Sequence, residues 1–247
     1  MRMLLELQDH RDACFLTLTY DDAHLPVDGS LDVRHFQLFM KRLRKRVRSR
    51  IRFFHCGEYG DMSRRPHYHA VLFGFDPPDK QRWTVSASNP LYISPLLNET
   101  WGMGFVTVGE VSFESAAYVA RYCVKKITGA GASSHYKGMN PETGELFDLE
   151  PEYCTMSRNP GIGKKWFERF SADVYPDDFI VVGGVKMRPP RAFDKYLEVL
   201  DGDLYDSVKY RRVARAIEFA EHCTPERLAD REKVTKLRLS LNHRGAA

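Results

Sequence analysis

The sequence predicts an α+β fold, in which helices cover the faces of an antiparallel sheet and a helical extension follows. Three observations lead to this class. Short segments rich in β-branched and aromatic residues recur along the first half of the chain, and helical patterns separate them. Most connections between these segments are short, which favours antiparallel pairing of neighbours. From about residue 192 onward the chain is mostly helical in pattern and ends in a highly charged tail.

The first elements are a strand, a basic helix and two more strands. Residues 15–20 alternate in polarity as a half-buried strand does. Residues 32–50 carry apolar side chains at helical spacing, with the basic side chains mostly on the other face. Residues 51–56 and 67–75 are predicted to be strands joined by a glycine-containing connection. Because this connection is short, the two strands should pair in antiparallel fashion.

The next region is predicted to complete the sheet. Residues 77–95 resemble a loop-like insertion, and residues 95–101 a short helix. A strand over residues 105–111 and a helix over residues 112–126 follow, with Ser112 as the N-cap. Together with the earlier elements, this order predicts a ferredoxin-like or RRM-like core.

The remaining chain is predicted to contain a long ordered loop over residues 129–165, because Gly, Ser, Pro and Asn are frequent there. A short helix should begin near Trp166, and a hairpin should turn at Gly183 and Gly184. We therefore expect a first domain over residues 1–175. Residues 176–247 should form a hairpin and helical extension that packs on it.

Composition excludes several classes of protein. With 43% hydrophobic and 28% charged residues, the 247-residue chain resembles an ordinary soluble globular protein. No apolar run approaches the ~20 residues that a membrane-spanning helix needs, and no signal peptide is recognisable. The five cysteines are odd in number and widely spaced. Reduced thiols in a cytoplasm are therefore expected, and neither a disulfide framework nor a structural zinc site is indicated.

One strand carries a candidate metal site. His67 and His69 are two residues apart, so both imidazoles point to the same face and can bind one ion. Imidazole ligands hold Mg²⁺ only within a mostly oxygen shell, so a carboxylate is expected nearby. If the two adjacent strands pair, Glu58 returns to the neighbourhood of the histidines. The sequence therefore predicts a three-ligand site that leaves positions for water and phosphate.

The helix after Ser112 carries candidate nucleophiles. Tyr118 and Tyr122 are one turn apart and therefore share a face, near Lys125 and Lys126. Ala116 and Ala120 are among the residues expected on the opposite, apolar side. A tyrosine is a weak nucleophile because its reference pKa is about 10. A cation on the scissile phosphate, helped by a lysine, reduces this handicap. Which tyrosine attacks first stays open.

Basic residues indicate a nucleic-acid surface, although the formal net charge is only +4. Residues 33–56 contain no acidic residue and many arginines and lysines, which can neutralise phosphates and release counterions. Other basic residues lie beside the proposed ligands and nucleophiles or in the glycine-containing segment of residues 156–165. We expect DNA contacts from Arg42, Lys45, Arg65, Arg121, Arg158, Lys164 and Lys165.

Taken in order, the segments Phe-Leu-Thr-Leu-Thr-Tyr (15–20), Gly-Glu-Tyr-Gly (57–60) with Arg-Pro-His-Tyr-His (65–69), and Tyr118-x-x-x-Tyr122-x-x-Lys-Lys resemble the three motifs of HUH endonucleases. More narrowly, the chain resembles the two-tyrosine replication initiators of microviruses, especially the gokushovirus branch. The segments 156–165 and 188–191 extend this resemblance, which fades after about Leu200. Tyr68 stands between the histidines, where the family often has a bulky apolar residue.

The resemblance implies the HUH palm as the fold and rolling-circle replication of a phage genome as the function. A metal-dependent nickase and ligase would cut single-stranded DNA at an origin and stay attached to the 5′ phosphate. It implies Mg²⁺ or Mn²⁺ as the cofactor, held by Glu58, His67 and His69, and the two tyrosines as alternating nucleophiles. It also implies host polymerase and helicase as partners, action in the host bacterial cytoplasm, and no membrane association.

Two other functions fit parts of the pattern. A transposase or relaxase of the same superfamily would share the metal site and act on another DNA. An RRM-like module would bind single strands through exposed aromatic residues and need no metal. A nucleotide hydrolase of the HIT type needs a third alternating histidine, and Val71 occupies that position.

Overall fold

The computed structural model describes residues 1–60, 62–83, 90–121, 126–139 and 144–243. The chain divides into two compact units, residues 1–169 and 170–247, and helix α6 (Lys164–Val174) crosses the boundary between them. The boundary that we expected from the sequence lies after residue 175. No described helix is long and apolar enough to cross a membrane.

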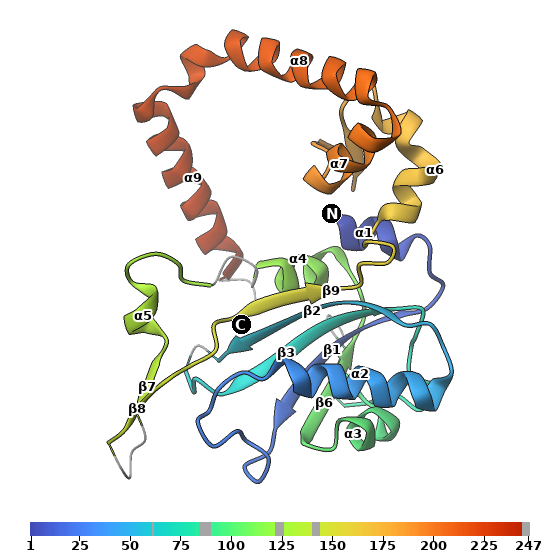
Figure 1. Cartoon of the computed structure of the whole chain (residues 1–247), viewed down its shortest axis with the longest axis vertical. Coiled ribbons are helices and arrows are strands. Elements are labelled where there is room, and N and C mark those ends of the chain that lie inside the picture. The colour runs from blue at the N-terminus through green and yellow to red at the C-terminus, as the bar shows by residue number, and fades with distance from the viewer. Residues whose placement is uncertain (61, 84–89, 122–125, 140–143, 244–247) are drawn as a thin grey trace. The chain divides into compact units, whose positions relative to one another are not determined.

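The first unit is built on an antiparallel sheet in the order β4-β5-β6-β1-β3-β2-β9 (Figure 1). Its strands are β1 (Ala13–Tyr20), β2 (Arg52–Tyr59), β3 (Pro66–Phe73), β4 (Gln81–Arg82), β5 (Tyr92–Ile93), β6 (Gly104–Gly109) and β9 (Tyr153–Met156). The other elements are α1 (Arg2–Leu7), α2 (Val33–Val47), α3 (Pro95–Trp101), α4 (Phe113–Arg121), α5 (Ala132–His135) and the hairpin β7 (Lys137–Met139) and β8 (Leu146–Asp148).

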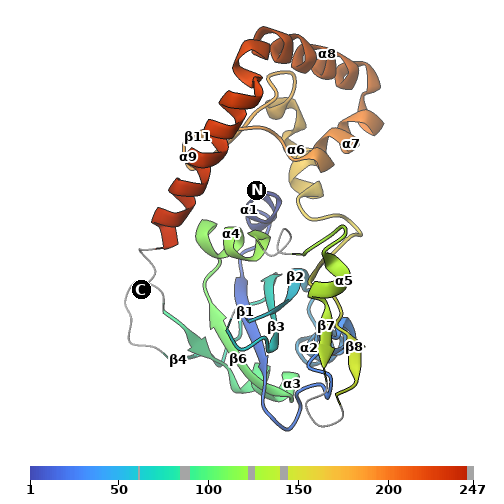
Figure 2. The ribbon, with the colours of Figure 1, turned by 90° about the vertical axis from the view of Figure 1, so that its left-hand side faces the viewer.

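Helices cover both faces of the sheet (Figure 1). On one face, which we call the α2 face, α2 and α3 pack on alternate residues of β1 and β3. On the other, the α4 face, α1 and α4 pack on the remaining residues. Figure 2 shows β6 running into α4, which returns the chain to the α4 face. The succession β1-α2-β2-β3-α3-β6 follows the β-α-β-β-α-β order of ferredoxin-like folds.

Local chemistry explains where α2 begins and ends. The Asp32 carboxylate accepts a hydrogen bond from the backbone N–H of Arg34 at 2.7 Å, which caps the first turn. The helix ends at Arg48, whose backbone is left-handed. Its apolar stripe lies on the sheet, and the buried residues are Phe36, Phe39, Met40 and Leu43. The predicted basic helix is therefore present, with its charged side exposed.

The second unit contains a short hairpin and helices. Strands β10 (Ile180–Val182) and β11 (Val185–Met187) pair around Gly183 and Gly184, as predicted. The helices are α7 (Arg191–Leu200), α8 (Gly202–Glu218), the 3₁₀ helix η2 (Ala220–Cys223) and α9 (Pro225–His243). The predicted α+β class, with an antiparallel sheet, helices on its faces and helices in the last part of the chain, is confirmed.

Some predicted boundaries and one predicted loop were wrong. Residues 129–165 are not a loop throughout, because β9 forms there and joins the edge of the sheet beside β2. The predicted loop of residues 77–95 contains β4 and β5. Both regions are short strands that pair with distant segments, so their own composition does not reveal them. The helix predicted near Trp166 is longer than expected and begins at Lys164.

Candidate functional site

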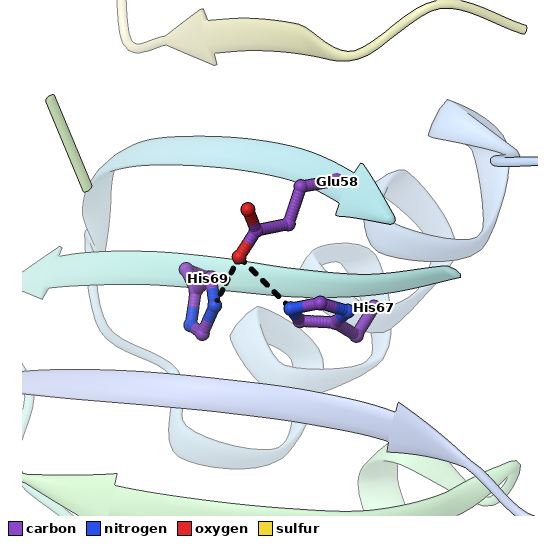
Figure 3. Close-up of side chains that lie close together, drawn as sticks. All are labelled: Glu58, His67 and His69. Carbon is purple, nitrogen blue, oxygen red and sulfur yellow. Dashed lines mark hydrogen bonds and ion pairs between the residues drawn. The ribbon is translucent and has the colours of Figure 1, made fainter. Parts of the chain in front are cut away.

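Strand pairing brings the three predicted metal ligands together. Glu58 of β2 lies directly opposite His67 of β3, and Cys56 lies opposite His69. The Nε2 atoms of His67 and His69 are 2.9 and 2.8 Å from the same carboxylate oxygen, Oε1 of Glu58 (Figure 3). Their ligand atoms all lie within 4.8 Å of one another, and this is the cluster of the described residues that could hold a metal ion.

The spacing and chemistry of these atoms fit a divalent cation. Two adjacent ligands of an octahedral ion at ~2.1 Å are about 3 Å apart, close to the separations between Glu58 and the two histidines. One carboxylate and two imidazoles form a mixed oxygen and nitrogen set with room for further oxygen ligands. The cluster could therefore bind Mg²⁺ or Mn²⁺ without a change in strand register.

Glu58 is held in its ionised form. Burial of its carboxylate would raise the pKa, but hydrogen bonds from His67 and His69 and their charges outweigh burial and lower the pKa of Glu58 to about 2. The side chain is only 2% exposed. A buried carboxylate that stays negative near neutral pH is a ready ligand for a cation.

The far side of each imidazole is also bonded. Nδ1 of His67 lies 3.2 Å from the backbone carbonyl of Arg65, which can only accept, so this nitrogen carries the hydrogen. Nδ1 of His69 lies 3.0 Å from the hydroxyl of Thr17 on β1. Such bonds fix the ring orientation and leave Nε2 as the metal-binding atom. Sequence reasoning missed Thr17, although strand alternation and pairing with β3 place it on the same face.

Tyr118 lies beside this cluster. Its ring meets the ring of His69 edge-on, with centroids 5.2 Å apart, and it also contacts Phe15 at 6.3 Å. Phe15 in turn stacks on His69 at 5.6 Å. On α4, Ala116 and Val119 are buried, whereas Tyr118 is 41% exposed. The helix therefore packs through its apolar side and presents Tyr118 at the edge of the cluster.

A cleft of about 480 Å³ opens over the ligands. His67, His69, Tyr118 and Arg65 line it together with the hydroxyls of the β1 threonines. The Arg65 guanidinium is anchored by Asp22 at 2.7 Å and by the backbone carbonyl of Tyr20 at 3.1 Å. The cleft thus combines a possible cation site, a tyrosine and an arginine in one space that is open to solvent.

Comparison with known proteins assigns a family to the part of the chain that builds this site. Residues 13–127 match the sequence model of a family described as replication-associated protein, of the ORF2 kind. This segment belongs to that replication-associated family. It contains every strand and helix that supplies a ligand, Thr17 and Tyr118.

Individual phage proteins resemble the chain over a longer stretch. It is 32% identical over 206 residues to the replication-associated protein VP4 of Bdellovibrio phage phiMH2K, covering 79% of this chain and 61% of the relative. It is 31% identical over 213 residues to the replication-associated protein ORF2 of Spiroplasma virus 4, covering 80% and 62%. The chain thus spans about three fifths of the length of these curated relatives.

A third relative, the replication-associated protein ORF4 of Chlamydia phage 1, is 29% identical over 224 residues, covering 84% of this chain and 53% of the relative. No solved structure gives a significant match. The predicted resemblance to the replication proteins of microviruses is confirmed by these matches.

The other predicted catalytic residues have different positions relative to the ligand cluster. Tyr122 and Lys125 lie outside the described residues. Lys126 is exposed and lines a separate cavity with Asp32 and His35 of the α2 face. Ala120 was expected on the apolar side of α4 but is exposed, because the buried stripe follows Ala116 and Val119 instead. The catalytic roles of these residues stay predictions.

Among the predicted DNA-binding residues whose side chains the structure describes, Arg65 alone lines the cleft over the ligands. Arg42 and Lys45 belong to α2, on the other face of the sheet, and Arg42 donates to the carbonyls of Thr100 and Trp101 at 2.8 and 3.0 Å. Arg121 ends the described part of α4. The remaining three lie beyond β9: Arg158 is exposed, and Lys164 and Lys165 begin α6. Their contacts with DNA stay predictions.

Two other residues near the ligands have structural positions. His55 of β2 is buried on the α2 face, where it stacks on Phe36 with centroids 3.4 Å apart. Burial lowers the pKa of His55 well below its usual value. Tyr68 is buried on the same face and bonds to the hydroxyl of Tyr20 at 2.7 Å. Neither side chain shares the face of the ligands, which agrees with leaving both out of the predicted site.

Proposed function

We propose that this chain is a metal-dependent endonuclease that nicks single-stranded DNA at a phage origin and starts rolling-circle replication. The observation that carries the proposal is the convergence of Glu58, His67 and His69 on one point, with the Tyr118 ring packed against His69. The names of the relatives, which are replication-associated proteins of phages, support the same function.

In this proposal, Glu58, His67 and His69 hold Mg²⁺ or Mn²⁺. The bound cation supplies Lewis-acid polarisation of the scissile phosphate and stabilises the negative charge that develops on it. The chain contributes an ionised Glu58 and two imidazoles whose orientation is fixed by Thr17 and by the carbonyl of Arg65. The positive side chain of Arg65 lines the same cleft and can orient a phosphate.

The reaction is an exchange of phosphate esters. The hydroxyl oxygen of Tyr118 or Tyr122 bonds to phosphorus, and the bond from phosphorus to the 3′ oxygen breaks. The phenol loses its proton, and the departing 3′ oxygen gains one, aided by Lys125 or Lys126. The products are a 5′-phosphotyrosine and a free 3′ hydroxyl. Because one ester replaces another, the step is reversible and a second tyrosine can accept the strand later.

The free 3′ hydroxyl would prime a host polymerase, with a host helicase opening the duplex, in the cytoplasm of the infected bacterium. These partners follow from the proposed reaction, because a covalently held 5′ end and a free 3′ end are the starting point for strand displacement. The DNA that the cleft accepts is therefore a single strand containing the origin.

The proposed function can be tested with single-stranded origin DNA, Mn²⁺ and a denaturing gel. We expect a covalent protein–DNA band for the wild type and none for the Tyr118→Phe, Tyr122→Phe double variant. Tyr210→Phe is a matched control, because Tyr210 is an exposed tyrosine of the second unit. Absence of the band in the wild type, or its persistence in the double variant, would contradict the mechanism. The single variants identify the first nucleophile.

A second experiment separates the enzyme from a binding module. The His67→Ala, His69→Ala double variant should still bind single strands but form no adduct. A module of RRM type would lose nothing by this change, because it needs no metal. A transposase or relaxase would form an adduct with the ends of a mobile element or with a transfer origin, and comparison of these DNAs with a phage origin identifies the substrate.

A further inference from the structure

A second cleft lies at the opposite end of β2 from Glu58. It has a volume of about 430 Å³ and lies between the segment that follows α2 and the segment that follows β9. Four arginines line it, Arg44, Arg50, Arg52 and Arg158, and none of the described residues that line it is acidic. This concentration of positive charge is outside the site described above.

Two of the four arginines are held by the fold. Arg52 is buried and forms an ion pair with Glu6, so it adds no net charge to the cleft. Arg44 donates to the carbonyl of Ile51 at 2.7 Å, which anchors its guanidinium but leaves the positive charge in place. Burial lowers the pKa of Arg44, as expected for a cation partly removed from water.

The other two arginines are exposed. Arg50 makes a long contact of 3.4 Å with the carbonyl of Asn159, and Arg158 follows directly after β9. The segment around Arg158 is fixed to β2, because the backbone N–H of Ser157 donates to the carbonyl of Phe53 at 2.9 Å and the hydroxyl of Ser157 accepts from the N–H of Phe53. Within the described part of the chain, Arg44, Arg50 and Arg158 therefore present three uncompensated positive charges around one cleft.

An aromatic ring also lines this cleft. Phe53 is half-buried, and the guanidinium carbon of Arg44 lies 5.7 Å from the centroid of its ring. Proteins that bind single strands combine a positive groove along the backbone with aromatic or guanidinium surfaces on which bases stack. The cleft has both features. Duplex DNA would offer the same phosphates but keeps its bases paired and stacked.

The two clefts are connected by one strand. Arg52 begins β2, and Glu58 lies six residues further along it (58 − 52 = 6). At ~3.3 Å per residue, the arginines are about 20 Å from the metal ligands. This distance corresponds to about six nucleotides at the ~3.4 Å rise of one DNA strand.

We propose that this arginine cleft, defined by Arg44, Arg50 and Arg158, binds backbone phosphates of the single strand that is cut, about six nucleotides from the scissile bond. The inference rests on the proposed function and adds a second contact to it. A strand held at both places cannot slide along the sheet, so the cleft would help to place one chosen phosphate at Glu58, His67 and His69.

The test is fluorescence anisotropy with oligothymidylates of 6 and 24 nucleotides, without added divalent cation so that no strand is cut. The test variant is Arg50→Ala with Arg158→Ala. The matched control is Arg34→Ala with Lys41→Ala, which removes two exposed charges from α2. A second variant, Arg50→Lys with Arg158→Lys, keeps the charge, and circular dichroism verifies that each protein is folded.

For the 24-mer, removing two phosphate contacts should reduce the slope of log K against log salt by about 1.4 and weaken binding about tenfold at 0.15 M salt. The control and the lysine variant should keep a slope close to that of the wild type. The 6-mer is too short to reach both clefts, so the gain in affinity from 6 to 24 nucleotides should shrink in the alanine variant alone.

Equal losses in the alanine variant and its control would show only a general effect of charge and would overturn the inference. An unchanged slope in the alanine variant, or a greater loss for a 24-base-pair duplex than for the single strand, would overturn it as well. The covalent-adduct assay tests the proposed function separately. A normal adduct with an unchanged slope contradicts only the arginine cleft, and a missing adduct with the expected slope change contradicts only the nicking reaction.

Discussion

The two faces of β3 differ although they are built from alternate residues of one strand. On the α2 face, Tyr68, Ala70 and Leu72 are fully buried under α2 and α3. On the α4 face, Val71 and Phe73 are buried in the same way, but His67 at the start of the strand is partly exposed beside the cleft. One face is therefore packed from end to end, whereas the other is packed at one end and open at the other.

This difference shows how the fold positions its reactive groups. Tyr68 bonds to the hydroxyl of Tyr20, and its own hydroxyl donates to the carbonyl of Asp32 at 2.9 Å. These contacts fix the backbone of β3 between two histidines. The packed α2 face thus holds the strand in register, and the open end of the α4 face can carry polar ligands that pack poorly in a core.

The largest effects should come from substituting neighbours on this strand. His69→Ala should lower the rate of adduct formation with Mn²⁺ by a thousandfold or more, because it removes one of three ligands, and it should change stability little. Tyr68→Ala should lower the free energy of unfolding by about 3–5 kcal/mol, because a large buried side chain is lost. Urea unfolding and the adduct assay measure the two effects.

Those two variants would contradict the comparison if their effects were exchanged. A His69→Ala protein that retains its adduct yield would remove His69 from the proposed site. A Tyr68→Ala protein of normal stability would show that the α2 face does not hold β3 in place.

The next effect concerns the packed end of the α4 face, where Glu6 of α1 is buried. Burial would raise the pKa of Glu6, but hydrogen bonds from Arg52, the backbone of Gly163 and His10 lower it overall. The ionised carboxylate therefore stabilises the folded chain fully above a pH of about 4.5. That contribution is lost as the pH falls through the lowered pKa.

Glu6→Gln should cost about 3 kcal/mol near pH 7, because it leaves Arg52 buried without its counter-charge. Unfolding in urea at pH 7 and in steps below pH 5 should show that the gap between the two proteins narrows in acid. A gap that stays constant or widens would mean that the Glu6 carboxylate does not control this pH dependence.

A smaller effect should distinguish two threonines of β1 on the α4 face. Thr17→Val removes the hydroxyl that bonds Nδ1 of His69 and should weaken Mn²⁺ binding about 10- to 100-fold. Thr19→Val is the matched control, because its hydroxyl donates to the carbonyl of Phe105 instead. Calorimetric titration with Mn²⁺ measures both. Equal affinities in the two variants would show that Thr17 does not orient the ligand.

Much of the site could be predicted from the sequence because it depends on strand periodicity. Two residues apart on a strand means one face, so His67 and His69 had to lie together. A short connection meant an antiparallel pair, so Glu58 had to return toward them. The amphipathic pattern of α2 likewise indicated which of its sides would be buried.

The remaining features depend on contacts between distant segments. The segment that forms β9 contains Tyr153 and Cys154 but is too short to be recognised alone, and only its pairing with β2 makes it a strand. The position of Arg158 at the arginine cleft depends on that pairing. Arg42 looked like a DNA ligand in the basic run, but its bonds to α3 arise only when the two helices pack.

The smallest effect tests whether the α2 face supports the strand without taking part in the reaction. Asp32→Ala removes the carboxylate that caps α2, and the loss of such a cap costs about 1 kcal/mol. The backbone of Asp32, which bonds the hydroxyl of Tyr68, is kept by the substitution. Urea unfolding should therefore show a small loss of stability, while the adduct yield at saturating Mn²⁺ stays normal. If the adduct yield fell while stability did not, the two faces would be coupled through Asp32 and Tyr68, and β3 would transmit a change on its packed face to its histidines.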